Sequence, residues 1–67
     1  MEEMRHLINS GIKYEDEFID LYMKVIRDEG FLYLFGSNQA KAKELLSQLI
    51  QESNEHKQIL EKIISQL

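Results

Sequence analysis

Two ionisable side chains occupy positions where a helical pattern normally places Leu or Ile. Glu15 lies at the centre of the apolar stripe in the first half of the chain and His56 at the centre of the stripe in the second half, when residues are turned by about 100° each. Glu52 precedes His56 by one turn and projects to the same side. Because a buried unpaired charge costs several kcal/mol, these groups must be paired, protonated, hydrated or bound to a metal. Carboxylate and imidazole donors together suit Fe, Mn or Zn.

The stripes that carry these residues predict an all-α chain. Proline is absent, and apolar residues recur at three- and four-residue spacing almost from end to end. The first pattern runs from Met4 to about residues 28–29 and could continue to Phe35. Asn9-Ser10-Gly11 favours a break or kink, with Ser10 capping a new helix and residues 2–9 forming a separate short one. The alternative is a single helix that tolerates Gly11 at a cost of ~1 kcal/mol.

The clearest helix stop follows Phe35. Gly36 suits a left-handed C-terminal position, and Ser37 or Asn38 suits an N-cap, so a second helix is expected from about residue 39 to residue 65. Two long helices joined by so short a loop fold back as an antiparallel hairpin. Residues 1–67 therefore form one helical hairpin domain.

A domain of 67 residues is marginal alone. The chain has no Cys, which excludes disulfides and zinc-thiolate sites and fits an intracellular setting. Oligomerisation is the remaining means of stabilisation, and two hairpins packing into a four-helix bundle would cover both stripes. We expect a homodimer or larger assembly that buries five apolar residues: Tyr22, Val25, Ile26, Leu45 and Leu49. The apolar block 30–35 is expected to be core or interface rather than a cofactor-binding segment.

The charge pattern narrows the classes of partner. The net charge is −4, and Lys and Arg are spread singly rather than clustered, which argues against nucleic acid as a partner. No apolar run reaches the ~20 residues of a membrane span, and the N-terminus lacks the basic region of a signal peptide. We expect a soluble, cytoplasmic protein with no membrane partner. His6, off the main stripe, is expected at the surface, and no Ser has a His and an acid at a catalytic spacing.

Residues 12–64 resemble the ferritin-like di-iron proteins, in particular the encapsulated ferritins and rubrerythrin-type proteins. Glu15 followed seven residues later by Tyr22 looks like their first half-motif, and the segment around Glu52 and His56 is similar to their second, a Glu three residues before a His. The resemblance implies a half-bundle that assembles its metal site across a dimer. It also implies iron chemistry, with Fe(II) meeting O₂ or peroxide, or iron storage.

The chain departs from this family at one position. Three residues before His56 it has Ser53 rather than Glu, and a serine hydroxyl is a poor ligand for iron. Glu52 is the possible substitute, so the expected metal set is Glu15, Glu52 and His56 from each chain, with Fe, Mn or Zn as the metal. The alternative is a non-catalytic helical dimerisation or interaction module that has lost the metal site and binds none. In that module the inward polar residues only fix the register of the helices.

Overall fold

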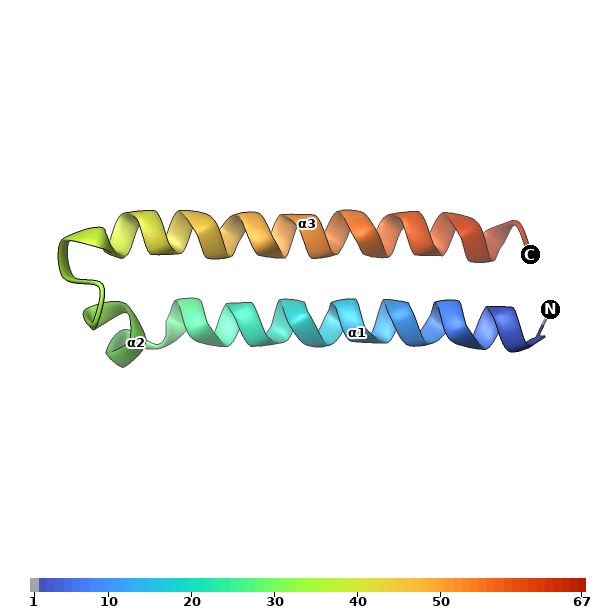
Figure 1. Ribbon diagram of the computed structural model, residues 1–67, viewed down its shortest axis with the longest axis horizontal. Coiled ribbons are helices and arrows are strands. Elements are labelled where there is room, and N and C mark those ends of the chain that lie inside the picture. The colour runs from blue at the N-terminus through green and yellow to red at the C-terminus, as the bar shows by residue number, and fades with distance from the viewer. Residues whose placement is uncertain (1) are drawn as a thin grey trace.

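Two long antiparallel helices make up most of the computed structural model, which describes residues 2–67 and every side chain among them except that of Leu32. The elements are α1 (Glu2–Arg27), α2 (Glu29–Tyr33), the 3₁₀ turn η1 (Gly36–Asn38) and α3 (Gln39–Ser65). Helices α1 and α3 lie side by side, and the start of α1 and the end of α3 lie opposite the turn (Figure 1). The molecule measures 50 × 15 × 11 Å, and its shortest dimension is the thickness of a single helix layer. The predicted all-α hairpin and the extent of its second helix are confirmed.

The predicted break at Asn9-Ser10-Gly11 is wrong, and residues 2–9 are not a separate helix. Helix α1 runs through this segment without interruption. The Ser10 hydroxyl donates to the backbone oxygen of His6 at 3.0 Å, which keeps it inside the helix instead of capping a new one. Gly11 lies against α3, where an added Cβ would be 3.3 Å from Cδ1 of Leu60. The glycine therefore marks a close approach of two helices rather than a helix end.

The turn uses Asp28 and Gly36. Asp28 stands outside the helices, and its Oδ1 accepts a hydrogen bond from the backbone N–H of Phe31 at 2.8 Å, so it caps the short helix α2. Gly36 has φ of +53°, the left-handed conformation that the sequence predicted there. Asn38 holds the N-cap position of α3, but its side chain makes no capping hydrogen bond. In the block 30–35 the large side chains that the structure describes, Phe31, Tyr33, Leu34 and Phe35, are all exposed, so they are not core within one chain. The prediction for the side chain of Leu32 lies outside the described residues.

The seam between α1 and α3 is too narrow to bury large side chains. Ala42 and Ser53 are the only buried residues among those whose side chains the structure describes. The other residues of the seam are partly buried; they are Ile8, Ile12, Glu15, Ile19, Tyr22 and Ile26 on α1 and Leu46, Ile50, Leu60 and Ile64 on α3. A single layer of two helices thus leaves much of each apolar stripe uncovered.

The two faces of this layer differ in polarity. One, here called the apolar face, carries nine large side chains that are 41–61% exposed: Met4, Leu7, Tyr14, Phe18, Leu21, Leu45, Leu49, Ile59 and Ile63. The other carries an ion pair between Asp16 and Lys57, with 2.8 Å between Oδ1 and Nζ. Asp16 projects about 160° away from Phe18 around α1. Among residues 2–67 no helix is long and apolar enough to cross a membrane.

Candidate functional site

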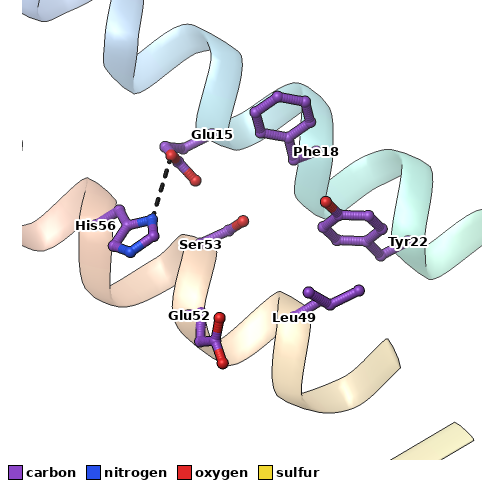
Figure 2. Close-up of a pocket in the computed structure, with 7 residues that line it drawn as sticks. All are labelled: Glu15, Phe18, Tyr22, Leu49, Glu52, Ser53 and His56. Carbon is purple, nitrogen blue, oxygen red and sulfur yellow. Dashed lines mark ion pairs between the residues drawn. The ribbon is translucent and has the colours of Figure 1, made fainter. Parts of the chain in front are cut away.

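A groove opens on the apolar face near the middle of α1 and α3. Its volume is about 190 Å³. Figure 2 shows the seven lining side chains, which are Glu15, Phe18 and Tyr22 of α1 and Leu49, Glu52, Ser53 and His56 of α3. Five of the seven carry a carboxylate, imidazole or hydroxyl group, and the other two, Phe18 and Leu49, are apolar. All three predicted metal ligands therefore line one groove.

Glu15 and His56 form the only ion pair of this groove among the described residues. Oε1 of Glu15 and Nδ1 of His56 are 3.4 Å apart, drawn as the dashed line in Figure 2. The Glu15 side chain is 17% exposed and that of His56 is 59% exposed, so the carboxylate belongs to the seam and the imidazole to its edge. A carboxylate beside Nδ1 leaves the other ring nitrogen, Nε2, to bind a metal, and metal-binding histidines are commonly held in this way.

Of the two residues expected to face inward beside His56, Ser53 does so more than Glu52. Ser53 is 6% exposed and lies in the seam, whereas Glu52 is exposed. In Figure 2 the Glu52 carboxylate points away from α1. Within residues 2–67 of one chain, no group of three or more His, Asp or Glu side chains is placed to hold a metal ion. One chain thus brings Glu15 and His56 together but leaves Glu52 apart from them.

Two aromatic rings form the wall of the groove on α1. The rings of Phe18 and Tyr22 are stacked, with centroids 6.3 Å apart and an angle of 18° between their planes. Tyr22 is partly buried, in keeping with a packing role. His6, predicted at the surface, is exposed on α1. The groove therefore combines an apolar wall with one acid-base pair.

The pair Asp16–Lys57 was not foreseen from the sequence. Its hydrogen bond and charge raise the pKa of Lys57 above its ordinary value, although desolvation acts in the opposite direction. A signal for it was present, because Asp16 follows Glu15 directly and Lys57 follows His56 directly. Once Glu15 faces His56 across antiparallel helices, the next residues of each helix come close on the neighbouring face.

Comparison with known proteins gave no match to a family model, a curated protein or a solved structure. The resemblance to ferritin-like proteins therefore stays a prediction from the residues themselves. What the groove can do has to be argued from its own geometry.

Proposed function

We propose that this chain is a half-bundle that dimerises through its apolar face into a four-helix bundle and holds a divalent transition metal between the two grooves. The observation that carries the proposal is the position of Glu15, Glu52 and His56, which all line the one groove in the apolar face. A polar groove in the middle of an otherwise apolar surface needs a polar or charged occupant when that surface is covered.

The surface area supports a partner on this face. The chain exposes 5338 Å², whereas the size scaling of compact monomers gives about 4,450 Å² for 8.0 kDa. The excess is roughly 900 Å², close to the ~800 Å² that each partner loses in a standard protein interface. The nine exposed side chains of the apolar face would supply this area without rearrangement.

The donors of one groove are too few, and a second copy supplies the rest. Glu15 lies near the middle of α1, which spans Glu2–Arg27. Stacking two apolar faces about a two-fold axis near that point sets the grooves opposite each other and offers four carboxylates and two imidazoles. Such a set suits Fe(II), Mn(II) or Zn(II). When bound, iron would supply one-electron chemistry toward O₂ or peroxide, and the chain's own groups would hold the ion and exclude bulk water through Phe18 and Leu49.

The test is metal binding by the purified protein. Metal content is measured after preparation without chelator, and the melting temperature is recorded with and without Fe(II), Mn(II) or Zn(II). Binding to the folded dimer must raise stability by mass action. His56→Ala removes the imidazole, and Asn54→Ala on the same helix serves as a control, because Asn54 does not line the groove. No bound metal and no shift with any of the three ions would refute the metal site.

A second candidate function is a non-catalytic dimerisation module. The burial of Ser53 favours it, because Ser53 stands where the ferritin-like proteins that the chain resembles have a ligating Glu, and only 6% of the residue is exposed. In this module Glu15 and His56 contact each other and fix the alignment of the helices. A dimer that binds none of the three metals would select this candidate over the first.

A further inference from the structure

We infer that the partner on the apolar face is a second copy of this chain, packed with the two hairpin turns at opposite ends, so that His56 of each chain faces the partner's Glu52. This inference rests on the proposed dimer and adds its orientation and register. It also assigns a partner to Glu52, which one chain leaves exposed and apart from Glu15 and His56.

On the apolar face, the exposed residues of α3 are arranged to pack against the same residues of a second copy running in the opposite direction. Their spacing alternates strictly between four and three residues and reads the same from either end. They are Leu45, Leu49, Glu52, His56, Ile59 and Ile63. Antiparallel helices pair such positions in alternating layers. Centring the pairs on residue 54 sets Leu45 against the partner's Ile63 and Leu49 against the partner's Ile59. The same alignment brings Glu52 opposite the partner's His56.

The matching strip of α1 has the same property from Leu7 to Val25. Its spacing of four and three residues again reads the same from either end, with four exposed positions and two partly buried ones: Leu7, Tyr14, Phe18 and Leu21 are exposed, and Gly11 and Val25 are partly buried. Centring it on residue 16 places Tyr14 against the partner's Phe18, Gly11 against the partner's Leu21 and Leu7 against the partner's Val25.

One two-fold axis serves both helices. Gly11 lies beside Leu60, and Glu15 lies beside His56. Moving one residue toward the turn along α1 therefore corresponds to moving one residue toward the N-terminus along α3. Residue 54 of α3 thus lies level with residue 17 of α1. The two centres, residues 16 and 54, agree within about one residue, or ~1.5 Å of helix.

Charge complementarity selects this orientation over the other two-fold arrangement. With both turns at the same end, α1 would lie over the partner's α3, and Phe18 would cover the partner's Glu52 with no basic group opposite. Burying that carboxylate unpaired is unfavourable. With the turns at opposite ends, His56 lies between Glu15 of its own chain and the partner's Glu52, so each imidazole meets one carboxylate from each chain.

The chain contains no Cys, so single-cysteine variants give an unambiguous test of this register. Leu45→Cys and Ile63→Cys are prepared separately, mixed, and oxidised or joined with a short thiol cross-linker. Turns at opposite ends predict a covalent dimer from the mixture and none from either variant alone, because identical positions would lie roughly 27 Å apart along α3. The comparison mixture, Leu7→Cys with Ile63→Cys, brings thiols together only when both turns lie at the same end.

Sedimentation of the reduced variants and of the unmodified chain accompanies the cross-linking. A dimer that cross-links only in the mixture of Leu45→Cys and Ile63→Cys supports the inference. A dimer that cross-links in the mixture of Leu7→Cys and Ile63→Cys, or in neither mixture, overturns the register and leaves the proposed dimer standing. An unmodified chain that sediments as a monomer overturns the dimer itself, and with it the inference.

Discussion

Leu60 of α3 packs against the bare backbone of Gly11 in α1, and an added Cβ at Gly11 would lie 3.3 Å from Leu60 Cδ1. The contact is tight but involves the far end of a flexible side chain that is only partly buried. Gly36, in the turn, differs in kind, because its φ of +53° is a conformation that other residues adopt at a cost.

Alanine substitutions at these two glycines should therefore have opposite signs. Gly11→Ala gains ~0.8–1 kcal/mol of helix propensity. The small shift of Leu60 that the new Cβ requires offsets part of this gain, so we expect a net stabilisation of about 0.5 kcal/mol. Gly36→Ala should destabilise by roughly 1–2 kcal/mol. Urea unfolding followed by circular dichroism measures both. A large loss of stability in Gly11→Ala would show that Leu60 cannot move.

The sequence predicted most of the fold because it depends on local patterns. Helix spacing, the absence of Pro and the turn at Gly36 indicated two helices and the limits of the second. The error at Gly11 has a simple cause. A glycine that ends a helix and a glycine that admits a neighbouring helix look alike until the neighbour is known, and the neighbour, Leu60, is far away in the sequence.

The ion pair between Asp16 and Lys57 predicts a loss of stability at high pH. The pKa of Lys57 is raised in the folded chain by its hydrogen bond to Asp16. A raised pKa contributes stability that is fully present below the unfolded value, near 10.4, and is lost as pH rises through the folded value. Asp16→Asn should thus melt below the parent at pH 8, and the difference should shrink as pH rises through the raised pKa of Lys57.

Melting temperatures between pH 8 and 12 measure this effect. Glu44→Gln is the matched control, because Glu44 and Lys41 are 3.9 Å apart and both more than half exposed. Exposed pairs of this kind contribute little. A gap between Asp16→Asn and the parent that persists unchanged to pH 12 would contradict the assigned role of Lys57.

Asp28→Ala should loosen α2 without unfolding the hairpin. The Asp28 carboxylate accepts the hydrogen bond from the Phe31 N–H that begins this helix. Loss of an N-cap costs roughly 0.5–2 kcal/mol, and here the loss falls on a helix of five residues. Hydrogen exchange at the Phe31 amide should accelerate in Asp28→Ala and stay slow in Asp28→Asn, which keeps the cap. Equal exchange in the two variants would refute capping by Asp28.

Ser53→Glu distinguishes a metal site from a closed seam. Ser53 is 6% exposed, so a carboxylate there is buried and should destabilise the metal-free protein by several kcal/mol. If the two grooves hold a metal, Fe(II) or Mn(II) should reverse that loss. Ser53→Glu should then bind the metal tighter than the parent by more than the roughly tenfold that corresponds to 1.4 kcal/mol. Thermal melting of the parent and Ser53→Glu during metal titration measures both effects. A variant that melts lower and gains nothing from metal would support the module without metal.

The candidate site could be predicted only in part. Glu15 and His56 were found because each replaces an apolar residue at the centre of a stripe, and the two do meet. The placement of Glu52 and Ser53 could not be settled in the same way. Both lie within about 60° of His56 on a helical projection, and the helix rotation that sends Ser53 into the seam and Glu52 outward is set by α1.

Sedimentation equilibrium of the unmodified chain tests the proposed dimer most directly, with Leu21→Lys and Gln58→Lys beside it. Leu21 is 53% exposed on the apolar face, whereas Gln58 is exposed outside it. Interfaces of this size have dissociation constants of about a micromolar or lower. At about 100 µM the parent and Gln58→Lys should therefore sediment as dimers and Leu21→Lys as a monomer. A parent that remains monomeric, or a Leu21→Lys variant that dimerises as well as the parent, would contradict an interface on the apolar face.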